Sequence, residues 1–376
     1  MATEDSDGAA RVVDVLPLAA LDRSLAYAVP ERLREELRLG SLVRIPLRNR
    51  AEMGVVSRLE SREQVSPDKL KQVQALVHEE PVLTPELLRL AEWMRGYYAA
   101  HTESILEAMI PAAIRKGAKP KIQRFIAAGR APDAEELAAL ERRAPKQAAL
   151  LQFLQQQMRP QPRQKVLERL KVGAASCDSL VEKGLVAEST ERVERSAYDD
   201  PFAAAETVAS HVEFDLTEGQ AAAVADINRD LDAGVFGVRL IHGVTGSGKT
   251  EVYLRAVDRV LAEGGSVLFL VPEVALAPQT VGRIRSRLEA RGVKTVVWHS
   301  HLSEGERYDA WRAVARGEAR VVVGARSAVF APVKNLRLIV VDEEHEPAYK
   351  QEDAPRYHGR DVAVYRAYLN GCPCLL

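Results

Sequence analysis

The sequence predicts a multidomain protein with three parts: a β-rich N-terminal domain, a helical winged-helix domain, and an α/β P-loop (RecA-like) lobe with a parallel sheet. Three observations carry this prediction. Short apolar runs separated by turn residues fill residues 11–80, and helical patterns follow one another over 133–190. From about Phe214 onward, apolar β-branched runs alternate with helical patterns. The length of 376 residues fits about two or three domains.

We expect five segments along the chain. They are a disordered start at 1–10, the β-rich domain at 11–112, the winged-helix-like domain at 113–195, a linker at 196–212 and the P-loop lobe at 213–376.

Composition places the chain among globular proteins with real cores, because 47% of its residues are hydrophobic and 28% are charged. The net charge of -1 shows no overall basic excess, so a nucleic-acid site must come from local patches. Three cysteines (Cys177, Cys372 and Cys374) form neither a disulfide framework nor a zinc pattern. An acidic start and the lack of a long apolar run predict no signal peptide and no membrane span, hence a cytoplasmic protein.

The N-terminal domain should be a small barrel or sandwich. Its expected strands are Val12–Leu18, Ala26–Val29, Leu42–Leu47, Gly54–Leu59 and Val73–Val77. Thr84 and Pro85 then form a helix start, with a capping residue before a proline. A second short helix is expected from Thr102 to Met109.

Two basic segments follow. Residues 108–132 hold six basic side chains and no acidic one, which usually indicates a solvated linker face. The helical segments expected next are Ala134–Arg142, Lys146–Gln157, Gln164–Leu170 and Ser176–Lys183, ahead of a short strand at Gly184–Val186. This order suggests a winged helix, and generic helical packing explains it as well. Within it, a recognition helix could carry phosphate contacts from Arg159, Arg163, Lys165, Arg169 and Lys171.

The most specific motif, G-x-x-x-x-G-K-T, runs from Gly243 to Thr250 between an apolar strand pattern and a helical one. Glycines let backbone amides face phosphate oxygens, and the helix N-terminus adds positive potential. Lys249 should reach the β- and γ-phosphates of ATP, and the Thr250 hydroxyl should bind Mg²⁺. The expected nucleotide contacts are Gly243, Thr245, Gly246, Ser247, Gly248, Lys249 and Thr250.

A second motif, Asp342-Glu343-Glu344-His345, ends a buried strand roughly ninety residues after the phosphate loop. The carboxyl ends of parallel strands meet at one edge of a sheet, so Asp342 can face Thr250 and Mg²⁺. Glu343 can orient or deprotonate the attacking water. We therefore assign Lys249, Asp342 and Glu343 as the catalytic set.

Two roles are equally consistent with the position of Gln220 in the sequence. It stands before the phosphate loop, where a glutamine could contact adenine. With Thr217 it also fits a capping box that opens the following helix. Both roles would compete for one side-chain amide.

The motifs together resemble one family. Asp-Glu-Glu-His combines with Pro272-Glu273…Pro278-Gln279, Trp298-His299-Ser300, Gly324-Ala325-Arg326-Ser327, Tyr349-Lys350-Gln351 and Arg356-Tyr357-His358-Gly359. This set is similar to the PriA family, the replication-restart helicases of superfamily 2, over essentially the whole chain. The resemblance implies an ATP- and Mg²⁺-dependent 3′-to-5′ DNA helicase. It also implies a bacterial, nucleoid-associated location and partners that include forked and single-stranded DNA, primosome proteins and single-stranded DNA-binding protein.

The resemblance also assigns DNA contacts. These implied contacts are Pro272, Glu273, Gln279, Thr280, Arg326, Ser327, Tyr349, Lys350, Arg356 and Tyr357. In the loop from Tyr349 to His358, the tyrosines offer stacking faces and Lys350 and Arg356 offer phosphate partners.

Two departures from the family pattern bear on function. Ala26 stands where the family often has the aspartate of its 3′-end pocket, so that recognition depends on whether nearby Asp22 substitutes. The family's serine-alanine-threonine motif, its cysteine-rich zinc region and its second lobe do not occur in this sequence, which predicts a fragment or truncated homologue without structural zinc. A fork-binding scaffold that does not hydrolyse ATP, and another P-loop translocase of the restriction or chromatin type, are the alternative functions.

Overall fold

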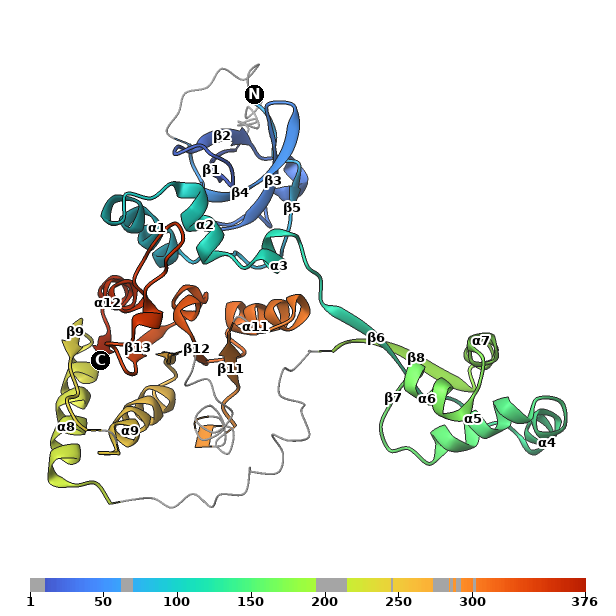
Figure 1. The fold of residues 1–376 in the computed structure, drawn as a ribbon. Coiled ribbons are helices and arrows are strands. Elements are labelled where there is room, and N and C mark those ends of the chain that lie inside the picture. Colours follow the sequence, from blue (N-terminus) through green and yellow to red (C-terminus); the bar gives the residue numbers. More distant parts are fainter. Residues whose placement is uncertain are drawn as a thin grey trace, which may run out of the picture. The chain divides into compact units, whose positions relative to one another are not determined.

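The computed structural model describes residues 11–61, 70–193, 215–244, 246–272, 284, 287–288, 292–299 and 302–376 (Figure 1). The chain divides into two compact units, one formed by residues 119–195 and the other by residues 1–118 together with 196–376. The expected disordered start and the expected linker at 196–212 lie outside the described residues. Within the part that the structure describes, no helix is long and apolar enough to cross a bilayer.

The N-terminal domain is built on an antiparallel five-stranded sheet in the order β2-β1-β4-β3-β5. The strands are β1 (Val12–Pro17), β2 (Leu25–Ala28), β3 (Leu42–Leu47), β4 (Arg50–Arg58) and β5 (Ala75–Leu76). All five lie where the sequence predicts them. Alternate residues of β1, such as Val13 and Val15, enter a core with Tyr27 and Ile45, whereas Leu42 and Val55 on the other face enter the core that contains α1.

Helices complete this domain. They are the short 3₁₀ turn η1 (Glu31–Leu33), α1 (Pro85–Tyr97), α2 (Thr102–Met109) and α3 (Ala112–Arg115). Helix α1 begins at the predicted proline, and its buried face (Leu87, Leu90, Ala91 and Met94) follows the helical period. The same core cluster continues from α1 and α2 into the α/β lobe, which explains why the two parts form one unit.

The lobe contains a six-stranded sheet in the order β11-β12-β10-β13-β14-β9, with every pair of neighbours parallel. Its strands are β9 (Gly237–Arg239), β10 (Ser266–Leu270), β11 (Thr295–Trp298), β12 (Val321–Gly324), β13 (Leu336–Val341) and β14 (Pro373–Leu375). This confirms the predicted parallel sheet. Strand β9, which leads into the phosphate loop, lies at an edge of the described sheet.

Helices cover both faces of this sheet. They are α8 (Glu218–Ala233), α9 (Lys249–Ala262), α11 (Glu304–Arg316) and α12 (Gly359–Asn370), with the 3₁₀ turns η4 (Arg326–Phe330) and η5 (Pro347–Tyr349). Leu338 and Val340 of β13 pack with α8 and α9, whereas Ile339 and Val341 pack with α11 and α12. The period of two in a strand therefore divides the core into two layers.

The unit at 119–195 has its own core beside an antiparallel sheet in the order β7-β6-β8. Its elements are β6 (Lys121–Ala128), α4 (Ala134–Arg143), α5 (Pro145–Gln155), β7 (Gln161–Pro162), α6 (Arg163–Leu170), α7 (Ala174–Glu182) and β8 (Val186–Val193). The four helices lie where the sequence predicts them.

The interpretation of residues 108–132 as a linker face is wrong. This segment contains α3 and the strand β6, which pairs along its whole length with β8. Several of its basic side chains form ion pairs with nearby carboxylates. Arg115 lies 2.5 Å from Glu107, and Arg130 lies 2.8 Å from Glu136.

Candidate nucleotide site and nucleic-acid interface

The phosphate loop joins β9 to α9. Gly246 and Gly248 adopt left-handed backbone angles, with φ of +82° and +81°, which glycine reaches without strain. A Cβ atom on Gly248 would also lie 2.4 Å from Nε2 of Gln220. The glycines are therefore needed for the turn, and a side chain at position 248 would also displace the amide of Gln220. Thr245 lies outside the described residues.

Lys249 begins α9 and turns back into the loop. Its Nζ donates a hydrogen bond of 2.7 Å to the carbonyl oxygen of Gly243. Thr250, the next residue of α9, is exposed. The side chain of Lys249 therefore folds back onto its own loop, where a backbone carbonyl oxygen accepts a hydrogen bond from its ammonium group.

The structure shows how Gln220 uses its amide. Its Oε1 accepts the backbone N–H of Thr217 at 3.0 Å, and the Thr217 hydroxyl accepts the N–H of Gln220, so the predicted capping box is present. Its Nε2 donates to the carbonyl oxygen of Ser247 at 2.9 Å. The single amide therefore both caps α8 and holds the phosphate loop.

A cavity of about 420 Å³ opens beside this contact. Its lining includes Gln220 and Ile227 from α8, residues 239–243 before the loop, and Lys249. Arg239 at its edge is fixed by a bidentate pair with Asp230, at 2.7 and 2.9 Å. The hollow is large enough for part of a nucleotide and lies directly against the phosphate loop.

The acidic motif directly follows β13, which is an inner strand of the sheet. The backbone N–H of Asp342 continues the sheet by donating to the carbonyl of Leu270 at 2.9 Å. Burial raises the pKa of the Asp342 carboxyl, and the charge of Glu343 raises it further, while Lys249 lowers it. Helix α9, which begins at Lys249, packs against β13, which ends just before Asp342. Both predicted catalytic residues therefore lie at the carboxyl edge of the sheet.

Glu343 follows in a left-handed backbone conformation, with φ of +48°. Only a few per cent of non-glycine residues adopt such angles, and they cluster at functional sites. Its N–H donates to Oδ1 of Asp342 at 3.2 Å, and His345 approaches its carboxylate at 3.7 Å. The turn therefore directs two carboxylates out of one strand end.

The residues fit ATP and Mg²⁺. Among the described residues, the half-buried Asp342 carboxylate has no ion-pair partner, and it lies at the carboxyl edge of the sheet where α/β folds bind ligands. Carboxylate and hydroxyl oxygens are the ligands that Mg²⁺ prefers, and Asp342 and Thr250 supply one of each. Elsewhere in the described ranges, no cluster of three or more His, Cys, Asp or Glu side chains could hold a metal ion.

Four of the implied DNA contacts, Pro272, Arg326, Ser327 and Tyr349, line a second hollow of about 80 Å³. It is lined by Val271, Pro272, Ala325, Arg326, Ser327, Ala348 and Tyr349. The ends of β10 and β12 and the turn after β13 thus bring three separate motifs together. Glu273, Gln279 and Thr280 lie outside the described residues.

The expectation that Tyr349 and Tyr357 offer open stacking faces is wrong for this conformation, because both rings are 1% exposed. The Tyr349 hydroxyl donates to the carbonyl of Asp342 at 2.7 Å. The Tyr357 ring packs against Phe330 and beneath the Arg326 guanidinium, and burial raises its pKa to about 12. The loop uses its tyrosines as internal anchors.

The cations of this loop occupy its outer side. Lys350 and Arg356 are exposed, and Nζ of Lys350 donates to the carbonyl of Arg356 at 2.5 Å. Arg326 instead donates to the carbonyls of Lys350 at 2.6 Å and Ala348 at 3.3 Å. Sequence reasoning missed this role of Arg326, which no local signal indicates.

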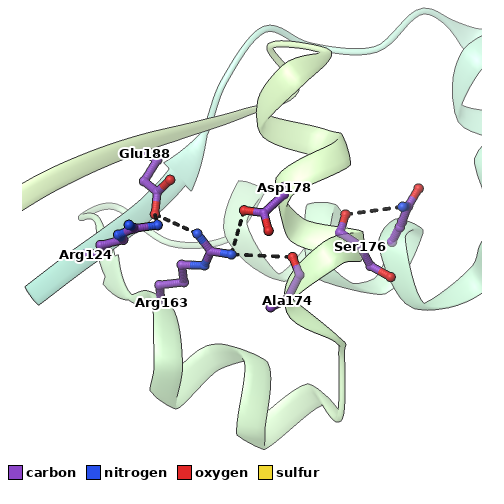
Figure 2. Close-up of polar contacts among 7 residues, drawn as sticks. Arg124, Arg163, Ala174, Ser176, Asp178 and Glu188 are labelled. Atoms are coloured by element: carbon purple, nitrogen blue, oxygen red, sulfur yellow. Dashed lines mark hydrogen bonds and ion pairs between the residues drawn. The ribbon is translucent and has the colours of Figure 1, made fainter.

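In the unit at 119–195, the reading of Arg163 as a phosphate contact is wrong. Figure 2 shows its guanidinium between two carboxylates, 2.8 Å from Glu188 and 2.7 Å from Asp178. The residue is 8% exposed and also donates to the carbonyl of Ala174. Arg159, Lys165, Arg169 and Lys171 are exposed, and Arg169 lies over the ring of Phe153.

In the N-terminal domain, Asp22 does not stand free to replace the missing aspartate. Its carboxylate accepts the backbone N–H of Thr102 at 2.8 Å and lies 2.7 Å from Nδ1 of His101. These bonds lower the pKa of Asp22 and fix it at the start of α2. Ala26 pairs across the sheet with Asp14, a buried carboxylate that accepts a hydrogen bond from Ser61.

Comparisons with known proteins agree with this arrangement. The family model "3'DNA-binding domain (3'BD)" of PriA matches residues 12–111, and the family model "DEAD/DEAH box helicase" matches residues 217–363. The structure of the DUF1998 helicase MrfA bound to DNA gives a TM-score of 0.32 at 19% identity, over 49% of this chain and 27% of that one. That overlap is too low to support an argument.

Curated relatives give the stronger match. The Bacillus subtilis replication restart protein PriA is 35% identical over 95% of this chain and 51% of its own length. The Chlamydia pneumoniae protein of the same name is 36% identical over 95% of this chain and 46% of its own length. The chain therefore spans about half the length of these relatives. Both family models and the curated relatives agree, and this chain is related over nearly its whole length to the replication restart protein PriA.

Proposed function

We propose that the chain carries the DNA-binding part and first ATPase lobe of an ATP-dependent 3′-to-5′ DNA helicase that recognises forked or stalled DNA and restarts replication by primosome assembly. The observation that carries the proposal is the shared edge of the parallel sheet. There the helix that begins at Lys249 packs against the strand that ends before Asp342, so the phosphate loop and the Asp342–Glu343 turn lie at the same edge.

Within this proposal, Lys249 leaves the carbonyl of Gly243 and binds the β- and γ-phosphates, and the backbone amides after Gly243 bind the same anion. Thr250 and Asp342 would hold Mg²⁺, and the ion would supply positive charge beside the phosphates. Glu343 orients the attacking water and accepts its proton. The cavity beside Gln220 receives the base and ribose of the nucleotide. If Gln220 also contacts adenine, its Nε2 must leave the carbonyl of Ser247.

DNA binding is proposed for three surfaces. Arg326 and Ser327 line the hollow with Pro272, which supports a contact with single-stranded DNA. Lys350 and Arg356 lie exposed on the neighbouring loop and can meet phosphates. Arg159 and Lys165 offer exposed cations on the unit at 119–195.

The proposal that this unit is a winged helix is supported by two helices, α6 and α7, framed by strands of one small antiparallel sheet. The sheet order β7-β6-β8 supports it too. Primosome proteins and single-stranded DNA-binding protein are proposed partners on the family resemblance, as is a nucleoid-associated cytoplasmic location.

The test is ATP hydrolysis by this 376-residue chain with and without forked DNA. The matched control is Glu343→Gln, which keeps the side-chain shape and removes the proposed base. We expect DNA-stimulated turnover in the parent chain and at least roughly 100-fold less in the variant, with ATP binding retained. ATP and fork binding without turnover would instead make the chain a fork-binding scaffold.

A further inference from the structure

The loop that follows the acidic motif is closed at a neck. Lys350 and His358 pair there as an antiparallel bridge, and the N–H of Gln351 donates to the carbonyl of Tyr357. On one side the neck continues through Tyr349 to the carbonyl of Asp342. On the other side His358 is the N-cap residue of α12. A shift of the neck would therefore act on the catalytic turn.

A residue of the N-terminal domain contacts both strands of this neck. Tyr98 follows α1, and its hydroxyl oxygen accepts the backbone N–H of His358 at 3.2 Å. The ammonium of Lys350 lies 5.8 Å from the centre of the Tyr98 ring, within the range of a cation–π contact. Residues that are 260 positions apart in sequence thus meet at the base of the loop.

The surrounding packing holds Tyr98 in place. Arg366 of α12 is 0% exposed, lies 2.9 Å from the carboxylate of Glu86 in α1, and donates to the carbonyl of Val329 at 2.7 Å. The rings of Trp93 and Tyr365 stack at 4.1 Å with an interplanar angle of 9°. Because α1 and α12 are joined by a buried ion pair and a ring stack, Tyr98 moves with both helices.

The loop has one further anchor inside the lobe. Arg326 donates to the carbonyl of Lys350 at 2.6 Å, next to the hollow that Arg326 itself lines. A ligand that draws Arg326 into the hollow would release this neck contact. The contact of Tyr98 with the neck would remain, and it comes from a different domain.

We propose that Tyr98 is a positioning residue that couples the N-terminal domain to ATP use, by holding the neck of the loop between the DNA hollow and the Asp342 turn. This rests on the proposed function, since it requires that the chain bind both ATP and DNA. The consequence is a coupling free energy between the two ligands that passes through the hydroxyl of Tyr98. Such coupling is reciprocal, so it can be measured from either ligand.

The experiment measures the affinity of a non-hydrolysable ATP analogue with and without saturating forked DNA. The ratio of the two dissociation constants is the coupling factor. The test variant is Tyr98→Phe, which keeps the ring over Lys350 and leaves the N–H of His358 without its acceptor. The control is Tyr97→Phe, on a neighbouring ring that is 62% exposed and stacks on Trp93.

We expect Tyr98→Phe to reduce the coupling factor about three- to tenfold. Tyr97→Phe should leave the coupling factor unchanged, and both variants should bind each ligand alone within about twofold of the parent chain. Equal coupling in Tyr98→Phe and the parent, or no coupling in the parent, would overturn the inference while leaving the proposed function intact. Failure of the parent to bind either ligand would overturn both.

Discussion

The two compact units each contain a charged group at least half-buried in the fold, and the two groups differ in their partners. Arg163 in the unit at 119–195 lies between Asp178 and Glu188, so its charge is neutralised where it stands. Asp342 in the α/β lobe has no ion-pair partner among the described residues, has Glu343 beside it, and carries a raised pKa. A buried charge with partners indicates structure, whereas one kept without them indicates a binding site.

The largest expected effect comes from the cation that faces Asp342. Lys249→Ala should weaken ATP binding by roughly 100-fold or more, because charge-assisted bonds to the phosphates are lost. Forked-DNA binding should stay nearly intact, since the proposed DNA surfaces do not include Lys249. Titration of each ligand measures this. If DNA binding collapses as well, the separation of the two sites is wrong.

Arg163→Met tests the buried charge that has ion-pair partners. Removing the guanidinium takes the shared cation from Asp178 and Glu188 and leaves Glu188 with Arg124 at 3.7 Å, so we expect a loss of about 2 kcal/mol in the free energy of unfolding of this unit. That is less than for a fully buried pair, because the Asp178 side chain is 51% exposed.

Hydrogen exchange along α7 and β8 reports this local stability. The exposed Arg159→Met serves as control and should change exchange little. Equal protection in the two variants would mean that the ion pairs at Arg163 do not stabilise the unit.

Asp342→Asn tests the charged group that has no ion-pair partner, and here we expect the substitution to raise the stability of the fold. The folded state raises the pKa of Asp342, so the fold binds the proton more tightly than the unfolded chain and loses stability as pH rises through the folded pKa. Asparagine avoids that loss, so the variant should melt about 1 to 3 °C higher at neutral pH while hydrolysis disappears.

A pH series of melting temperatures checks this. The advantage of Asp342→Asn should shrink as pH falls through the raised pKa of the parent carboxyl, where the parent becomes neutral too. A variant that melts lower at neutral pH would show that Asp342 is structurally paired, as Arg163 is.

The smallest expected effect concerns exposed charge. Lys165→Gln should reduce the slope of log affinity against log salt for duplex DNA by about 0.9, the value for one phosphate contact. The folded stability should not change, because Lys165 is exposed. Fluorescence anisotropy over a salt series measures the slope, and an unchanged slope would remove α6 from the proposed DNA surface.

The same contrast explains which features could be predicted from sequence. The phosphate loop and the strand before Asp342 were predictable, because residue spacing and apolar runs encode them locally. The roles of the cations at 159–171 were not, since tertiary packing buries Arg163 between two carboxylates and leaves Lys165 exposed. The burial of Tyr349 and Tyr357 and the contact between Tyr98 and His358 also depend on tertiary packing, which a single sequence does not display.

The most direct test of this account is hydrogen exchange across the nucleotide site with and without the ATP analogue and Mg²⁺. Nucleotide binding requires Lys249 to leave the carbonyl of Gly243, whereas β13 is already buried. We therefore expect strong new protection at 243–250 and little change in β13. No protection at the loop at saturating analogue, or protection confined to β13, would contradict it.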